Sequence, residues 1–256
     1  MNSLKEKSRA VLSKRTNSVR MWIAESPSTR DCHLIWYQIK KHGLRYILSR
    51  HYYGEPFFEE YLKLKPGYQK LAELIYEWAQ PKSVCDFGCG NGFLLYFLAQ
   101  RGIEVSGVEG SNDALKFMDN SIRPRILVRD LTEPIETSVH DLVISTEVAE
   151  HLPKRASETF VQNLANSAAR SIVFTAAHPG QWGDGHINCQ PRGFWIALFQ
   201  ARGWIYDQAA TERFTNSVRN SPEIVKTLPW MINNFMLFLP SQSRPGAYGI
   251  QEIKKG

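Results

Sequence analysis

The stretch Val84-Cys85-Asp86-Phe87-Gly88-Cys89-Gly90-Asn91-Gly92 runs from a short apolar segment into a glycine-rich turn. Gly88 and Gly90 permit positive φ angles and let the backbone approach a ligand closely. The apolar residues of 93–99 predict a helix after the turn, and its first turn would present free N–H groups. The stretch therefore predicts a ligand-binding loop between a strand and a helix.

Two features of this loop narrow the choice of ligand. Position 93 is Phe, so the glycines are spaced G-x-G-x-G rather than G-x-G-x-x-G as in dinucleotide-binding turns. Asp86 lies just inside the loop, where its carboxylate would repel a pyrophosphate and would suit a cationic or amino-bearing ligand. The spacing and the charge together argue against NAD.

Strands and helices alternate along the chain on both sides of the loop. Apolar runs predict strands over 83–87, 104–108, 125–128, 141–145, 171–176, 204–209 and 234–239. Apolar stripes at helical spacing predict helices after Pro66-Gly67 and over 93–99, 113–118, 154–169 and 194–202. This alternation predicts an α/β fold, a mainly parallel sheet with helices on both faces, in which ligands bind beyond the carboxyl ends of the strands.

Charge is unevenly distributed along the 256 residues. Residues 1–55 hold 11 Lys or Arg against 4 Asp or Glu, so they carry +7, whereas residues 56–256 carry −1. We expect a basic helical N-terminal arm or lid over 1–66, an α/β domain over 67–240 and a flexible tail over 241–256. The positive charge of the arm would favour binding to nucleic acid, to an anionic surface or to an anionic substrate. Alternatively, the arm is a helix with a solvated charged face.

The sequence also bears on the location of the protein. No apolar run reaches the ~18–20 residues of a transmembrane helix, and no apolar segment typical of a secretory signal follows the basic N-terminus. The four cysteines, Cys32, Cys85, Cys89 and Cys189, contain no C-x-x-C pair, which excludes a zinc knuckle or a thioredoxin-type motif. We expect a cytoplasmic protein with reduced thiols.

Acidic residues follow the second and third predicted strands. Glu109 ends the second strand, 19 residues beyond Gly90, where a carboxylate can accept hydrogen bonds from two ribose hydroxyls. Asp130 follows the third strand, where it can accept from an adenine amine, and Leu131 can flank the ring. These residues predict a nucleoside-containing cofactor.

The three loops together resemble those of the class I S-adenosylmethionine-dependent methyltransferases, over about residues 68–240. The resemblance implies a Rossmann-like sheet of seven mostly parallel strands and S-adenosylmethionine as cofactor. In that family the glycine-rich loop holds the methionine part, and the acidic residues of the next two loops hold the ribose and the adenine. The residues that we assign to the cofactor are Asp86, Gly88, Gly90, Glu109, Gly110, Asp130, Leu131 and Thr146.

The fourth predicted strand ends in Ser145-Thr146-Glu147-Val148-Ala149-Glu150-His151-Leu152-Pro153. This resembles the S-x-E-V-x-E-H-L segment of many small-molecule methyltransferases. Similar E-x-x-E-H arrangements with a later His bind a divalent metal in small-RNA 3′-terminal 2′-O-methyltransferases, and a related segment occurs in O-methyltransferases of ubiquinone biosynthesis. Glu147, Glu150 and His151 would share one face of a helical backbone, because they are spaced i, i+3 and i+4. We expect His151 and Glu147 to act in catalysis.

Three roles remain open for this segment. Glu147, Glu150 and His151, with His186 from the loop after the fifth strand, can hold one divalent cation that lowers the pKa of an acceptor hydroxyl. His151 can act as a general base without a metal, or the segment can be structural. The same loop, residues 178–192, holds the candidate substrate residues His178, Trp182 and Asn188.

The sequence therefore predicts an S-adenosylmethionine-dependent methyltransferase that acts on a hydroxyl, or an amine, of a small molecule. The main alternative is an RNA 2′-O-methyltransferase with a divalent metal, which the basic arm and the Glu-Glu-His segment favour. Against RNA, the cations of the arm are scattered and no RNA-binding module is recognisable. A non-catalytic cofactor-binding protein is the third class, and the intact cofactor loop disfavours it.

Overall fold

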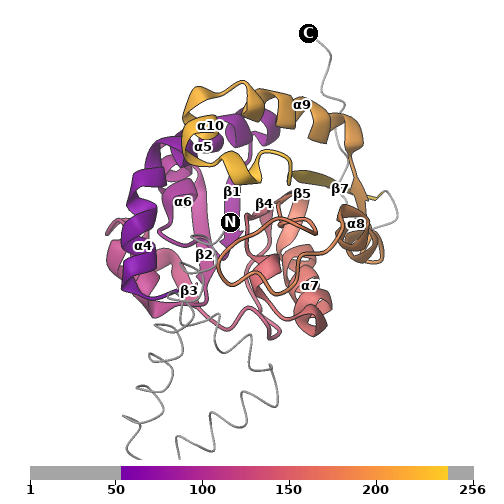
Figure 1. Cartoon of the computed structure of the whole chain (residues 1–256), viewed down its shortest axis with the longest axis horizontal. Helices are drawn as coiled ribbons and strands as arrows, with labels where there is room; N and C mark the ends of the chain where they lie inside the picture. Colours follow the sequence, from indigo (N-terminus) through magenta and orange to yellow (C-terminus); the bar gives the residue numbers. More distant parts are fainter. Residues whose placement is uncertain (1–52, 242–256) are drawn as a thin grey trace, which may run out of the picture. The chain divides into compact units, whose positions relative to one another are not determined.

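The computed structural model describes residues 53–241 (Figure 1). These residues belong to one compact unit. The helices are α4 (Glu55–Tyr61), α5 (Lys65–Ala79), α6 (Phe93–Ala99), α7 (Ser157–Ser167), α8 (Arg192–Gln200), α9 (Gln208–Arg219) and α10 (Pro222–Thr227). Short 3-10 helices are η1 (Leu62–Leu64), η2 (Asn112–Phe117), η3 (Arg123–Arg125), η4 (Ala149–His151), η5 (Lys154–Ala156) and η6 (Pro229–Met231).

One seven-stranded sheet forms the centre of the described part of the chain. Its strands are β1 (Ser83–Phe87), β2 (Glu104–Glu109), β3 (Ile126–Val128), β4 (His140–Ser145), β5 (Ala168–Phe174), β6 (Trp204–Tyr206) and β7 (Met236–Pro240). They lie in the order β3-β2-β1-β4-β5-β7-β6; β7 alone is antiparallel to its neighbours. This confirms the predicted seven-stranded, mostly parallel sheet.

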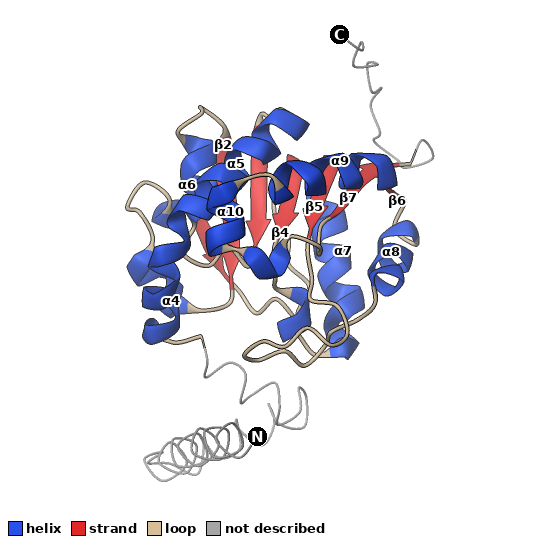
Figure 2. Ribbon diagram, turned by 45° about the horizontal axis from the view of Figure 1, so that its top comes forward, coloured by secondary structure: helices blue, strands red, loops and turns tan. Residues whose placement is uncertain are grey.

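Helices cover both faces of the sheet (Figures 1 and 2). Alternate strand residues point to opposite faces, and Val84, Leu142 and Val173 lie in one apolar core with residues of α5, α6, α9 and α10. On the other face, the ring of Phe174 lies 5.3 Å from that of Phe199 on α8, where α7 also packs. The two cores fix the strands, and therefore fix the loops at their carboxyl ends.

Several elements differ from the prediction. Residues 113–118, expected as a helix, form the 3-10 helix η2, whose N-cap Ser111 accepts the N–H of Asp113 at 3.3 Å. The strand expected up to residue 209 ends at Tyr206, because the Asp207 carboxylate accepts the N–H of Ala210 at 2.8 Å and starts α9. The expectation therefore missed α9 and also the following α10.

The predicted arm is only partly within the described residues. Residues 1–52 of the expected basic helical arm and the tail beyond residue 241 lie outside them. Helix α4, which the sequence placed in the arm over 1–66, packs against η2 beside the sheet. Among residues 53–241, no helix has the length and apolar character needed to cross a membrane.

Candidate active site

The candidate site lies where β1, β2 and β4 end. β1 pairs in parallel with both β2 and β4, so the carboxyl ends of the three strands lie side by side. The loop after β1 is also attached to β2, because the N–H groups of Gly88 and Cys89 donate to the carbonyl of Val108 at 2.7 and 3.3 Å. The topology thus brings the predicted cofactor and catalytic segments to one edge of the sheet, as expected for an α/β sheet.

The glycines of the cofactor loop serve two different purposes. Gly88 and Gly90 have φ angles of +79° and +54°. A Cβ on Gly88 would lie 2.4 Å from Cγ2 of Val148, so Gly88 lets the cofactor loop pack against the catalytic segment. A Cβ on Gly90 would meet no atom of residues 53–241 within 4 Å, so these residues leave open space beside the backbone. A ligand can therefore approach the loop closely at Gly90.

The carboxylate of Glu109 is buried and held in place by the backbone. One oxygen accepts the N–H of Gly90 at 2.8 Å, and the other accepts the N–H of Ser111 at 2.9 Å. Burial raises the pKa of Glu109, and these hydrogen bonds oppose that effect. Each oxygen has a second acceptor position, so the carboxylate can also bind two hydroxyl groups.

Asp86 is the second buried carboxyl of the cofactor side. Its Oδ1 atom has no hydrogen-bond partner among the described residues. Burial, with a contribution from Glu109, raises the pKa of Asp86 to about 8. A cationic amino group would supply the missing partner and favour the ionised carboxylate.

The other predicted cofactor residues also lie at this edge. Asp130 follows β3, and its Oδ1 accepts the N–H and the hydroxyl of Thr132 at 3.0 and 2.7 Å. The side chains of Leu131 and Thr146 are buried. Within the described part of the chain, the atom that a Cβ on Gly110 would approach is the carbonyl oxygen of Arg129, at 3.9 Å.

Glu147 does not lie on a helix as expected. Its φ is +55°, and η4 begins only at Ala149. Thr175, next to the end of β5, accepts the N–H of Glu147 at 2.9 Å through its hydroxyl. A left-handed backbone at a residue other than glycine costs about 1–3 kcal/mol and is concentrated at functional sites. Glu147 and Glu150 therefore converge through a strained turn and not through helical periodicity.

Asn234 is a site residue that the sequence analysis missed. It is buried just before β7, and its side-chain amide donates to the two Glu147 oxygens at 3.0 and 3.3 Å. The same amide donates to Gln181 Oε1 at 3.1 Å, so it joins the end of β4 to the loop after β5. The sequence offers one indication of this role: Asn234 is a polar residue at the start of an apolar strand. That strand lies antiparallel to β5, which brings its first residues to the edge where β5 ends.

Glu150 is fully buried on the side of the site that holds the predicted catalytic residues after β4, which we call the acceptor side. One carboxyl oxygen accepts the N–H of Ala177 at 3.2 Å, and the other has no partner among the described residues. Its backbone carbonyl accepts the N–H groups of Ile187 and Asn188 at 2.9 and 3.0 Å, which fixes the loop after β5. Burial and the neighbouring Glu147 carboxyl raise the pKa of Glu150 well above its usual range.

His151 and His186 complete the acceptor side. Their ring centroids lie 4.9 Å apart, and potential ligand atoms of Glu150, His151 and His186 all lie within 4.8 Å of one another. Burial, assisted by His186, lowers the pKa of His151 to about 3, so its imidazole is neutral at pH 7. His186 is oriented by a 3.1 Å contact between Nδ1 and the carbonyl of Gln181. Three of the four predicted metal ligands therefore form one cluster, whereas the fourth, Glu147, is held by Asn234.

The three candidate substrate residues lie in different environments. Asn188 is buried and donates to the carbonyl of Ala149 and the hydroxyl of Ser157 at 3.1 and 3.0 Å, contacts that hold the loop in place. Trp182 is 98 % exposed, and His178 is exposed as well. Asn188 therefore stabilises the loop through hydrogen bonds, whereas the side chain of Trp182 lies in solvent.

Comparisons with known proteins agree with this geometry. Residues 85–168 match the family described as "Methyltransferase domain". Magnesium-protoporphyrin O-methyltransferase of Synechocystis is 26 % identical over 128 residues, which cover 44 % of this chain and 55 % of that protein. Ubiquinone biosynthesis O-methyltransferase of Leptothrix cholodnii is 31 % identical over 127 residues, 46 % of this chain and 49 % of that protein. The chain thus matches about half the length of these curated relatives.

Solved structures show the same fold. The Synechocystis magnesium protoporphyrin IX methyltransferase with bound SAH gives a TM-score of 0.56 at 17 % identity, over 75 % of this chain and 98 % of that one. A plantazolicin methyltransferase gives a TM-score of 0.54 at 12 % identity, over 82 % of this chain and 100 % of that one. The described unit therefore has the fold of class I S-adenosylmethionine-dependent methyltransferases.

Proposed function

We propose that this protein transfers the methyl group of S-adenosylmethionine to a hydroxyl of a small-molecule acceptor. The observation that carries the proposal is the meeting of two groups of residues at one edge of the sheet: the Glu109–Gly90 pair after β2 and β1, and the Glu150–His151–His186 cluster, whose first two residues follow β4. The names of the curated relatives, O-methyltransferases of magnesium-protoporphyrin and of ubiquinone biosynthesis, support an oxygen atom of a small molecule as the acceptor over RNA.

The residues of the cofactor side fit the parts of S-adenosylmethionine. Asp86 has a buried oxygen without a partner and suits the ammonium of the methionine part. Glu109 is oriented to bind both ribose hydroxyls, and Gly90 leaves the space that close approach requires. Asp130 and Leu131 would bind the adenine, with Gly110 and Thr146 contributing at the same edge.

The residues of the acceptor side would bind the hydroxyl and remove its proton. The sulfonium of the bound cofactor supplies an electrophilic methyl group, which leaves sulfur as the new oxygen–carbon bond forms. His151 is neutral at pH 7 because burial lowers its pKa to about 3, so one of its ring nitrogens can accept a hydrogen bond from the acceptor hydroxyl. A base this weak would take the proton only as the oxygen–carbon bond forms, because the methylated oxygen is then strongly acidic. Glu147, held by Asn234, lies beside the base and fixes the turn that carries it. Alignment of the two reactants provides much of the remaining rate enhancement.

A second candidate role for the same cluster is to hold a divalent cation. One carboxylate and two imidazoles, from Glu150, His151 and His186, form a donor set that suits such an ion, and the lowered pKa of each histidine keeps it unprotonated. A bound cation would lower the pKa of the acceptor hydroxyl. This assignment would place the chain in the E-x-x-E-H subgroup of methyltransferases.

The function is tested with isotopically labelled S-adenosylmethionine. The purified protein is incubated with a cell extract that has been separated into small metabolites and RNA. We expect the label in the small-metabolite fraction, on oxygen. Label in the RNA fraction would overturn the proposal in favour of the RNA alternative, and tight binding of SAH without any transfer would favour a non-catalytic role.

The cation is tested separately, by elemental analysis of the purified protein and by its activity after chelation. Stoichiometric metal and loss of activity that the added ion restores would support the cation. Full activity in chelator with no bound metal would exclude it and leave His151 as a metal-free base.

A further inference from the structure

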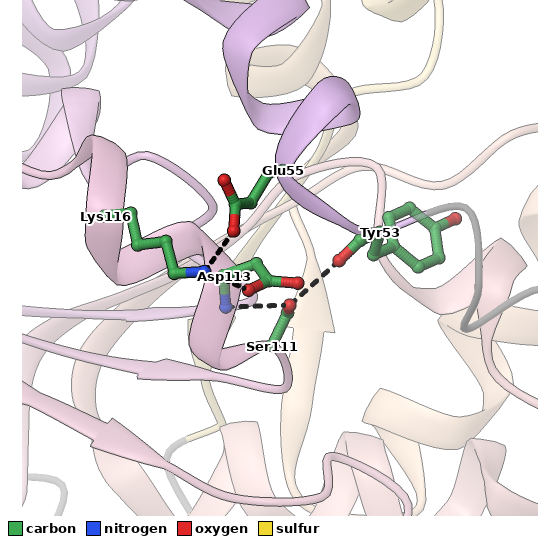
Figure 3. Close-up of polar contacts among 5 residues, drawn as sticks. All are labelled: Tyr53, Glu55, Ser111, Asp113 and Lys116. Carbon is green, nitrogen blue, oxygen red and sulfur yellow. Dashed lines mark hydrogen bonds and ion pairs between the residues drawn. The ribbon is translucent and has the colours of Figure 1, made fainter. Parts of the chain in front are cut away.

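The segment that leads into α4 is joined to the turn that orients Glu109 (Figure 3). The Ser111 hydroxyl donates to the carbonyl of Tyr53 at 2.9 Å, while the Ser111 N–H donates to Glu109. Lys116 forms ion pairs with Glu55 and with Asp113, the latter at 3.0 Å. Ser111 therefore contacts both the cofactor carboxylate and the backbone of Tyr53.

The side chain of Tyr53 points away from these polar contacts (Figure 3). Its ring centroid lies 5.3 Å from that of His151, in an edge-to-face arrangement. The hydroxyl of Tyr53 is buried and has no hydrogen-bond partner among the described residues. Burial, with smaller contributions that include Glu150, raises the pKa of Tyr53, so the phenol keeps its proton and is a hydrogen-bond donor.

Three buried polar atoms around His151 have no partner in the described part of the chain. They are the Tyr53 hydroxyl, the Nδ1 atom of His151 and the second carboxyl oxygen of Glu150. Leaving a buried polar group unpaired costs stability, so several such atoms in one place indicate a ligand site. A phenol that donates and a neutral imidazole nitrogen that accepts are complementary to a hydroxyl group, which can do both.

Aromatic rings extend this site along α4. The ring of Phe57 lies 4.9 Å from that of Tyr53 and 4.3 Å from that of Tyr61. All three side chains are partly exposed, whereas Phe58, next to Phe57, is buried in the core. Burial, with smaller contributions from Glu147 and Glu150, raises the pKa of Tyr61. A flat apolar ligand would find stacking partners here.

We propose that Tyr53 is an acceptor-binding residue and that the acceptor is an aromatic compound carrying a hydroxyl group. The Tyr53 phenol donates a hydrogen bond to the acceptor oxygen beside His151, and the rings of Tyr53, Phe57 and Tyr61 pack against the aromatic part. This inference rests on the proposed methyl transfer and names the substrate class of that same site. It also explains why Tyr53 is attached to the turn that holds Glu109: the two substrates are then bound next to each other.

The test compares Tyr53→Phe with Tyr76→Phe, a matched loss of a phenol at a partly exposed position of α5. The acceptor probes are 4-methylcatechol and the non-aromatic cis-1,2-cyclohexanediol. We expect wild-type protein to methylate the catechol and not the diol. Loss of a buried hydrogen bond should lower kcat/KM for the catechol in Tyr53→Phe by about 10- to 100-fold, mainly through KM. Tyr76→Phe should keep the wild-type value, and the Kd for SAH should be unchanged in both variants.

The outcomes separate this inference from the proposed function. If wild-type protein binds SAH and methylates neither the catechol nor any extract fraction, the proposed function fails. If it methylates extract metabolites but not the catechol, or methylates the diol equally well, the aromatic class is wrong. If Tyr53→Phe retains the kcat/KM of Tyr76→Phe, Tyr53 does not bind the acceptor.

Discussion

The two sides of the site are built in different ways. The cofactor side uses main-chain geometry: glycines with positive φ and a carboxylate that two backbone N–H groups orient. The acceptor side uses side chains that converge from distant segments, namely Tyr53, Glu147 and Glu150, the loop with His186, and Asn234. The cofactor side is therefore a local property of two strand ends, whereas the acceptor side depends on the whole fold.

This difference predicts that single substitutions separate the two sides. A change on the cofactor side should alter the Kd of the cofactor and leave the rate at saturation nearly intact. A change on the acceptor side should alter the rate or the acceptor KM and leave cofactor binding intact. The following variants test that division, from the largest expected effect to the smallest.

His151→Gln should have the largest effect on turnover. Glutamine retains hydrogen bonding but cannot accept the proton at neutral pH, so kcat should fall by about 10²- to 10⁴-fold. The Kd for SAH, measured by calorimetry, should stay within about twofold of wild type, because His151 lies on the acceptor side. A similar loss of SAH affinity would show that the two sides are not separate.

Glu109→Ala should have the next largest effect, which is a loss of affinity for the cofactor. The variant loses two charge-assisted contacts to the ribose, each worth about 1.5–3 kcal/mol, so the Kd for SAH should rise by about 100-fold or more. Glu109→Gln keeps the shape of the side chain and controls for collapse of the loop. Wild-type affinity in Glu109→Ala would remove Glu109 from the cofactor site.

Asn234→Ala should weaken the acceptor side without removing a reacting group. Glu147 and Gln181 would lose their shared donor, so kcat should fall by about tenfold and the free energy of unfolding by about 1–3 kcal/mol. Thr211→Val is the control. It removes the buried hydrogen bond that the N–H of Leu237 in β7 donates to the Thr211 hydroxyl in α9. Equal loss of stability with equal loss of kcat in both variants would mean that Asn234 only stabilises the fold.

Asp86 gives the smallest effect, a dependence of stability on pH. Its pKa rises from 3.8 in the unfolded chain to about 8 in the folded protein without cofactor. The folded state therefore binds the proton more tightly, and the stability that this provides is lost as the pH rises toward 8. Between pH 6.5 and 8.5 the free energy of unfolding should fall by about 1–2 kcal/mol more in wild type than in Asp86→Asn. Denaturant titrations at several pH values measure the free energy of unfolding. An equal change of this free energy with pH in wild type and Asp86→Asn would contradict a raised pKa.

The geometry of the loop after β1 could be predicted from the sequence because local rules govern it. A strand followed by G-x-G-x-G requires a turn with positive φ, and an acidic residue at the end of the next strand lies beside that turn in a parallel sheet. The alternation of strands and helices also predicted a mainly parallel sheet, and the structure confirms it, whereas the order of the strands and the antiparallel β7 come from the structure alone.

The acceptor side was predicted in part, for physical reasons. Glu150, His151 and His186 do converge, but through a strained turn at Glu147 and not through a helical face. Nothing local distinguishes Asn234 or Tyr53 from ordinary core residues, because their roles arise from an antiparallel strand and from the packing of α4. Asn188 was expected to bind substrate, yet its amide donates to Ala149 and Ser157.

The most direct test of the two-sided site measures methyl transfer from labelled S-adenosylmethionine to 4-methylcatechol as the cofactor concentration is raised. Wild type, Glu109→Ala and His151→Gln are compared in one assay. We expect Glu109→Ala to approach the wild-type rate at high cofactor concentration and His151→Gln to remain at least 100-fold slower at every concentration. A wild-type rate in His151→Gln, or a Glu109→Ala rate that saturates far below wild type at a wild-type cofactor KM, would contradict the proposed division of the site.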